Sequence, residues 1–278
     1  MGYPQILAEP LFRLFLGLVL ASAISFLAYW GRALSGSGAL AATLVGMVVF
    51  FGGGLPAAVL LLAFFVSSSA WSRFGLSRKS QAADRFAKGS RREAVQVMAN
   101  GAVPTLIAGV LLPLGLLRGV AWGALAGSLA AATADTWGTE IGLLAGKSPR
   151  LITTGRPVEA GTSGGITWQG TLAGLVGSFW IAVFALVFPG NTGRGLDFLV
   201  AITFAGVAGS GLDSWLGATL QARYECSRCG KKTEHHPLHR CGGSTFLVGG
   251  QPWANNEVIN FLCTLAGGLL GGVLLFVL

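Results

Sequence analysis

The sequence predicts an all-α fold, a polytopic bundle of about seven or eight transmembrane helices, and three observations support this. Of the 278 residues, 53% are hydrophobic and only 11% are charged, whereas soluble domains carry about 25% charged residues. Several apolar runs approach the roughly 20 residues that a helix needs to cross a bilayer. Glycine is abundant, with 43 residues, as is typical where small residues let membrane helices pack closely.

The apolar runs predict eight spans in a single membrane domain that covers residues 1–278. We expect these spans at 11–30, 38–53, 55–71, 94–117, 119–142, 167–189, 196–220 and 258–278. Three glycines at 52–54 and Pro56 separate the second span from the third, so this region forms either a tight hairpin or a broken helix. Residues 1–10 lack a basic n-region, and we therefore interpret 11–30 as a retained span, not a cleaved signal peptide.

Basic residues concentrate in three polar loops between the predicted spans. Residues 72–93 contain seven Lys and Arg, residues 147–159 three and residues 221–240 five, which is 15 of the 19 in the chain. With eight spans, all three loops lie on one side, which the positive-inside rule makes cytoplasmic. We expect a multi-pass protein of the cell membrane with an active site on its cytoplasmic face. The net charge of +8 favours anionic head groups or phosphorylated substrates as partners over nucleic acid.

Three carboxylates inside predicted spans are candidates for function: Asp135 and Glu140 near the cytoplasmic end of the fifth, and Asp213 in the seventh. A charge deep in a membrane helix costs about 2.5–3.5 kcal/mol, so such residues usually face the bundle interior and serve a function. The alternative is that they only form hydrogen bonds between helices. On an unbroken helix Asp135 and Glu140 are about 140° apart. Sharing one magnesium ion would require the helix to end or kink, and Gly138 is the obvious place.

A short internal echo predicts a tandem repeat. Asp135-Thr136-Trp137 recurs as Asp213-Ser214-Trp215, and Thr171-Leu172-Ala173-Gly174 recurs in the same order as Thr264-Leu265-Ala266-Gly267. A repeat would bring two equivalent acidic helix ends to one central site, as in repeat-built transporters.

The glycine-rich turn Gly161-Thr162-Ser163-Gly164-Gly165 precedes the sixth span. Backbone N–H groups in such a turn, next to a helix start, form an anion-binding nest. The turn lacks the Lys-Ser/Thr of a Walker A loop, and the alternative is a flexible loop whose Thr or Ser caps the helix. The nearby basic residues favour phosphate. Further substrate or nucleotide contacts are expected at Lys79, Lys88, Arg91, Asn100, Thr139, Lys147, Arg156, Asn256 and Asn260.

Four residues in the insertion at 221–250 have the spacing of a small tetrahedral zinc site. Cys226 and Cys229 form a C-x2-C pair, and His239 and Cys241 follow, with His236 as an alternative ligand. Because protein would fill all four positions, the site predicts a structural zinc ion and no zinc chemistry.

Several of these motifs together resemble a family of integral membrane proteins that includes transmembrane protein 19 and the phytyl-phosphate kinase of plants and cyanobacteria. The matching stretches are 95–101, 134–140, 157–165, 213–218 and 255–260. The resemblance implies a kinase that transfers a phosphoryl group from a nucleoside triphosphate, with CTP as the expected donor, to an isoprenoid monophosphate. Asp135, Glu140 and Asp213 would then serve a magnesium-nucleotide site, and residues 161–165 would bind phosphate. Asn255 stands where the family often has aspartate, and the Cys/His cluster is not general to it.

Two other functions fit the residues. Intramembrane acids and a repeat also suit a transporter or flippase for a polyprenyl phosphate. The other alternative is a membrane scaffold that binds a partner through its zinc loop. Because the polar motifs crowd one face, the kinase is favoured.

Overall fold

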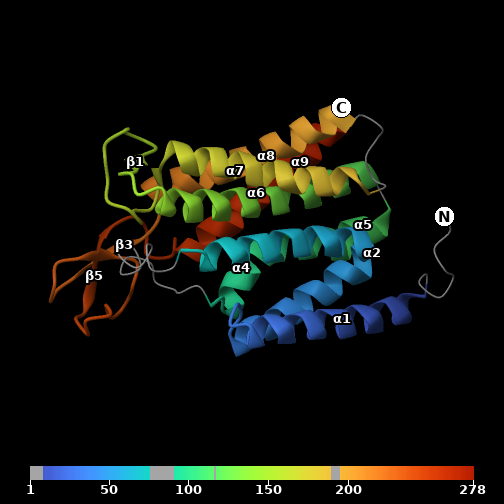
Figure 1. Cartoon of the computed structure of the whole chain (residues 1–278), viewed down its shortest axis with the longest axis horizontal. Helices are drawn as coiled ribbons and strands as arrows, with labels where there is room; N and C mark the ends of the chain where they lie inside the picture. Colours follow the sequence, from blue (N-terminus) through green and yellow to red (C-terminus); the bar gives the residue numbers. More distant parts are fainter. Residues whose placement is uncertain (1–8, 76–90, 116, 189–194) are drawn as a thin grey trace.

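The computed structural model describes residues 9–75, 91–115, 117–188 and 195–278. Its long helices lie side by side as one bundle, and the strands gather at one end (Figure 1). The helices are α1 (Pro10–Trp30), α2 (Gly36–Arg73), α4 (Ala94–Leu106), η2 (Ile107–Leu111), α5 (Leu112–Leu114), α6 (Arg118–Leu144), α7 (Trp168–Leu186), α8 (Gly195–Thr219) and α9 (Asn256–Val277).

Six helical segments in the described part of the chain are long and apolar enough to cross a membrane: α1, α2, α4 to α5, α7, α8 and α9. They confirm a polytopic helical membrane protein. Each predicted boundary in these segments lies within a few residues of the observed one.

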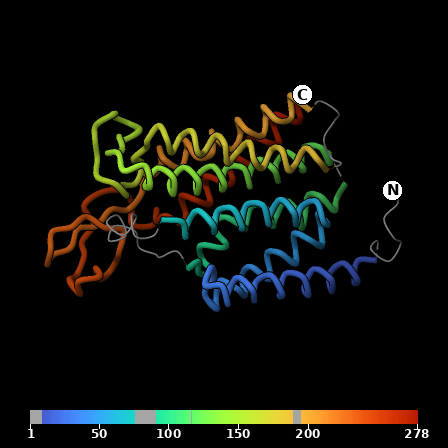
Figure 2. Tube along the Cα trace, viewed as in Figure 1, coloured from blue at the N-terminus to red at the C-terminus, as the bar shows by residue number. Residues whose placement is uncertain are grey.

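Helix α2 is a hairpin of two legs. Gly54 interrupts it with φ 64° and ψ −159°, a conformation that only glycine adopts easily, and Pro56 follows. The Arg73 guanidinium at the end of α2 donates to the carbonyl of Gly31, which precedes the start of α2, so both ends of the helix lie together. Figure 2 shows the two legs running in opposite directions. The two spans predicted at 38–53 and 55–71 therefore correspond to the two legs.

Helix α6 is the centre of the bundle and packs against α7, α8 and α9. It is less apolar than the six candidate spans, and it meets neighbouring helices instead of lipid, with residues such as Leu125, Leu129 and Ala130 fully buried. Glycines set its contact with α9: a Cβ on Gly127 would come within 2.3 Å of the Gly267 carbonyl oxygen. The backbones of these two helices touch, as small residues allow.

The expected break at Gly138 is wrong, because α6 continues through it to Leu144. Gly138 has a packing role instead. A Cβ on Gly170 of α7 would lie 2.6 Å from the Gly138 carbonyl oxygen, so the two glycines let α6 and α7 approach closely. Asp135 and Glu140 consequently project from one regular helix in different directions.

Two small sheets cover the end of the bundle where α2 and α6 finish and α7 and α9 begin (Figure 1). Strands β1 (Arg150–Leu151) and β2 (Gly165–Ile166) pair antiparallel. Strands β3 (Arg223–Cys226), β4 (Lys232–Thr233) and β5 (Thr245–Gly249) form a three-stranded antiparallel sheet in the order β4-β3-β5. This end therefore carries the polar loops of the molecule.

Candidate functional site

A polar cavity of about 780 Å³ lies at this end of the bundle. Arg92, Lys147 and Arg240, one from each of the three basic loops, all line it, so these loops share one end as predicted. Of the residues singled out in the sequence, it is lined by Asn100, Asp135, Thr139, Glu140, Lys147, Gly161, Thr162, Ser163, Gly164, Gly165, Asp213, Asn256 and Asn260. Lys79 and Lys88 lie outside the described residues.

The carboxyl groups of Asp135 on α6 and Asp213 on α8 lie close enough to interact and line the same cavity. Packing of the two helices explains the contact. A Cβ on Gly209 would lie 2.6 Å from the Ala131 Cβ, and each aspartate follows its contact residue by four positions, or about one helical turn. Residues 131 and 209 therefore set both acids at the same depth.

A second observation favours a ligand at the Asp135 and Asp213 carboxyl groups. The Oδ2 atom of Asp213 is buried and has no hydrogen-bond partner among the described residues. Glu140 interacts electrostatically with Asp135, and Glu234 with Asp213. Neighbouring carboxylates repel one another unless they share a proton or a cation. Carboxylate oxygens are the ligands that magnesium and calcium prefer, so these side chains fit a hard divalent cation.

The glycine-rich turn lies directly against α8. Gly164 has φ 77°, and a Cβ there would come within 2.5 Å of the Ala218 nitrogen. The backbone N–H groups of Thr162 and Gly165 donate to Glu159 and Thr162 carbonyls within the turn, at 3.1 and 2.9 Å. The predicted anion nest is thus reduced by two of its donors.

The alternative helix cap is also present, just beyond the turn. Thr167 Oγ1 accepts a hydrogen bond of 3.0 Å from the Gly170 N–H and caps α7. The glycine-rich turn, which lines the cavity, is therefore not itself the helix cap, because Thr167 beyond the turn caps α7.

Arg92, and not the expected Arg91, lines the cavity. Arg91 faces the other way: its Nε donates to the Leu34 carbonyl at 2.8 Å, and its guanidinium lies 5.1 Å from the centre of the Tyr29 ring. Neighbouring side chains of an extended segment point to opposite sides, and the charge pattern alone could not choose between the two. Burial lowers the pKa of the Arg92 guanidinium to about 10, against the opposing effect of Glu140, so Arg92 is cationic at neutral pH. Arg156 does not line the cavity either.

Glu234 and Arg240 line the cavity although sequence reasoning did not select them. Glu234 Oε1 accepts hydrogen bonds from Ser163 Oγ at 2.9 Å and from Gln221 Nε2 at 2.8 Å. The Cys/His loop is thereby tied to the glycine-rich turn. The signal that the sequence offers is that Glu234 and Arg240 both stand in the loop whose Cys and His residues predict a zinc site.

The Cys/His cluster is present with the four predicted residues. The ligand atoms of Cys226, Cys229, His239 and Cys241 all lie within 4.8 Å of one another. Cys241 Sγ is 3.5 Å from Cys226 Sγ, 3.7 Å from Cys229 Sγ and 3.2 Å from His239 Nδ1. Ligands of a tetrahedral zinc ion lie about 3.3–3.8 Å apart, so the cluster fits a tetrahedral metal. His236 is not part of it, because its ring stacks on Tyr224 at 4.4 Å.

The thiol environment also suits a metal. Burial raises the pKa of Cys226, but hydrogen bonds from the backbone of Cys229 and Arg228 outweigh it, and the pKa falls to about 7. Metals bind the thiolate form. The described residues thus present a cluster that can hold a metal ion, in the loop that also carries the cavity-lining Glu234 and Arg240.

The aspartates of the two Asp-Thr/Ser-Trp copies meet in the cavity, whereas the second pair of echoed segments differs in environment. Thr171 is exposed and lines the cavity, while Thr264 is fully buried. The tandem duplication stays a prediction.

Comparisons with known proteins identify the family. Residues 19–268 match the family described as integral membrane protein DUF92. An uncharacterised membrane protein of Methanocaldococcus jannaschii is 31% identical over 266 residues, which cover 95% of this chain and 94% of that protein. Protein PGR of Arabidopsis thaliana is 30% identical over 290 residues, covering 95% of this chain and 97% of that protein.

A shorter match is also informative. The chloroplastic protein VTE6 of Arabidopsis thaliana is 31% identical over 154 residues, which cover 54% of this chain and 46% of that protein. No solved structure matches significantly. The family match and the two full-length relatives confirm the resemblance that the motifs indicated. This chain belongs to the DUF92 family of integral membrane proteins.

Proposed function

We propose that this protein is a magnesium-dependent kinase of the membrane that converts an isoprenoid monophosphate to its diphosphate with a nucleoside triphosphate. One observation carries the proposal: two aspartates from different helices meet in a cavity that basic residues from three loops also line. Resemblance of the motifs to phytyl-phosphate kinases supports the lipid phosphate as substrate and CTP as the donor. The net positive loops support a cytoplasmic cavity in the cell membrane.

The proposed reaction requires that the protein position the substrates and offset the phosphate charge, and it requires little covalent chemistry from the protein. An oxygen of the lipid phosphate forms a bond to the γ-phosphorus, the bond from that phosphorus to the β-γ bridging oxygen breaks, and a nucleoside diphosphate leaves. A phosphate monoester has its second pKa near 6, so at neutral pH it attacks without a strong general base. Magnesium, when bound, offsets phosphate charge.

Different residues of the cavity would hold the metal and offset the phosphate charge. Asp135 and Asp213 would hold the metal, with Glu140 close by. Arg92, Lys147 and Arg240 carry positive charge toward the phosphates. The turn at 161–165 lines the same cavity and would offer backbone N–H groups other than those of Thr162 and Gly165. We further propose that the Cys226, Cys229, His239 and Cys241 cluster holds a structural zinc ion that fixes the loop bearing Arg240.

Purified protein in nanodiscs tests the activity. We expect radiolabelled diphosphate from [γ-32P]CTP, magnesium and geranylgeranyl monophosphate, and none in the presence of EDTA. ATP, GTP and UTP in parallel identify the donor. No labelled diphosphate with any donor, together with movement of prenyl phosphate across vesicles, would overturn the kinase and favour a transporter.

A further inference from the structure

The space between α7 and α8 changes along their length. Toward the middle of the bundle they touch: Ser178 Oγ donates to the Thr203 carbonyl at 2.9 Å, and a Cβ on Gly206 would lie 2.1 Å from Ser178 Oγ. Nearer the polar cavity both helices line open space: Thr171 and Gly174 of α7 and Ser210 and Gly211 of α8 all line the cavity. A Cβ on Gly211 would meet nothing within 4 Å. The two helices therefore part on the way to the cavity.

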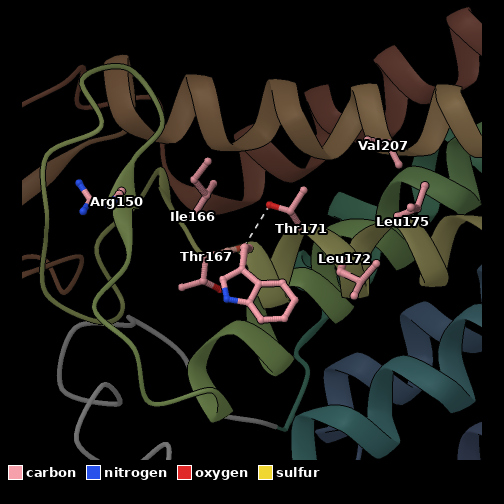
Figure 3. A pocket seen from close by; sticks show the side chains of 8 residues that line it. Arg150, Ile166, Thr167, Thr171, Leu172, Leu175 and Val207 are labelled. Atoms are coloured by element: carbon pink, nitrogen blue, oxygen red, sulfur yellow. Dashed lines mark hydrogen bonds between the residues drawn. The ribbon is translucent and has the colours of Figure 1, made fainter.

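An apolar groove lies at this parting (Figure 3). Its volume is about 550 Å³, in the range of ligand pockets. Leu172 and Leu175 of α7 face Val207 of α8 across it, and both leucines are about half exposed on the outer surface of the bundle, at 50% and 45%. On the outer surface of a membrane protein, apolar side chains such as these face lipid.

The groove and the polar cavity adjoin one another. Five residues line both, namely Ile166, Thr167, Thr171, Leu175 and Val207. Of the hydroxyl-bearing residues of the cavity, Thr171 also lines the groove, whereas Ser210 and Ser214 of α8 line the cavity alone. The lipid-facing groove therefore lies next to the cavity that holds the paired aspartates.

We propose that this opening between α7 and α8 is the binding site for the hydrocarbon chain of the substrate, whose phosphate lies in the polar cavity. The proposal rests on the proposed function for the identity of the substrate. A single-chain lipid phosphate needs an apolar site joined to a polar one, and the shared lining residues supply that junction. Bulk bilayer lipid is the competing occupant, because any outward groove is bathed in it.

Gly211→Leu is the variant that tests the site. A Cβ at this position would meet no protein atom within 4 Å, so the new side chain starts in open space on the cavity side of the groove, and leucine favours a helix more than glycine does. Gly195→Leu is the matched control: it makes the same change at the far end of α8, where the Cβ would only contact Leu186 at 3.8 Å.

Two measurements follow in nanodiscs. A diazirine-bearing prenyl monophosphate should label Leu172, Leu175 or Val207 in the wild type and in Gly195→Leu, with unlabelled prenyl phosphate as competitor. In Gly211→Leu this labelling should fall by about tenfold. The KM for geranylgeranyl monophosphate should rise by about tenfold, and that for dimethylallyl monophosphate, whose chain is too short to extend along the groove, by less than about twofold.

The outcomes separate the two proposals. Equal effects of Gly211→Leu on both substrates, or labelling that excess phosphatidylcholine displaces as well as prenyl phosphate does, would overturn the chain-binding site and leave the kinase intact. Absence of any diphosphate product would overturn the kinase, while competed labelling of the groove would still support binding of the chain.

Discussion

Asp135 and Asp213 are the residues on which the proposed chemistry depends. They extend from helices that touch at residues 131 and 209, and their carboxyl groups meet in the cavity. The buried Oδ2 of Asp213 has no hydrogen-bond partner in the described part of the protein. A cation that both residues bind would satisfy it and would offset their mutual repulsion.

Asp135→Asn and Asp213→Asn should each lower kcat by at least about 100-fold, because each removes a charged ligand from the site where phosphate charge develops. The double variant should lose little more than either single one, since the residues act as a unit. Calorimetry with Mg²⁺ should show weakened binding in both. Asp197→Asn, an exposed position in the first turn of α8, is the control. Unaltered magnesium affinity in the cavity variants would exclude the shared site.

Glu234 is a positioning residue, because it joins the Cys/His loop to Ser163 and Gln221. Glu234→Ala removes both hydrogen bonds and should lower kcat by about tenfold, with a loss of about 1.5–3 kcal/mol in stability. Glu234→Gln keeps an acceptor oxygen and should restore most of both. Glu225→Gln, on β3 outside the cavity lining, is the control. If Glu234→Gln is as inactive as Glu234→Ala, the charge of Glu234 and not its position matters.

At the scale of elements, the Cys/His loop and the spans were predictable for a shared reason. Each depends on a short, regular pattern: an apolar run of fixed length, or four ligands at close spacing in one loop. The contacts of Gly138 with Gly170, and of Glu234 with Ser163, join residues 32 and 71 positions apart. No local pattern encodes such pairs, and for that reason the helix break was wrong and Glu234 was missed.

The Cys/His cluster predicts a measurable metal content. Cys226→Ser and Cys229→Ser should each lose close to one equivalent of zinc by mass spectrometry, since a tetrahedral site loses a thiolate ligand. Activity should fall with the metal, because Arg240 and Glu234 come from the same loop. Cys263→Ala, in α9 and outside the cluster, should retain its zinc. Equal zinc in all variants would show that another site holds it.

For the whole molecule, the hairpin of α2 decides the number of membrane crossings. With α6 at its centre, the bundle has a helical counterpart for each of the eight predicted spans. The sequence could place the glycines and Pro56 at the turn, but it left the hairpin and the broken helix equally open. The contact of Arg73 with Gly31, between segments 42 positions apart, distinguishes them.

Accessibility of single cysteines tests that topology in intact cells. Ser37→Cys, just inside the start of α2, and Arg240→Cys should be labelled from the same side by a membrane-impermeant maleimide, and Leu117→Cys from the other. Ser37 and Leu117 are exposed in the structure. If α2 crossed only once, Ser37 and Arg240 would react from opposite sides.

The central position of α6 also has a consequence for biosynthesis. Its contact with α9 runs from Gly127 against Gly267 to Gly123 against Gly271, and α9 is synthesised only after α7, α8 and the Cys/His loop. Until then the least lipid-compatible helix lacks a main packing neighbour. The cavity can therefore form fully only after α9 packs against α6. Until then the insertion machinery or the earlier helices must shield α6 in the nascent chain.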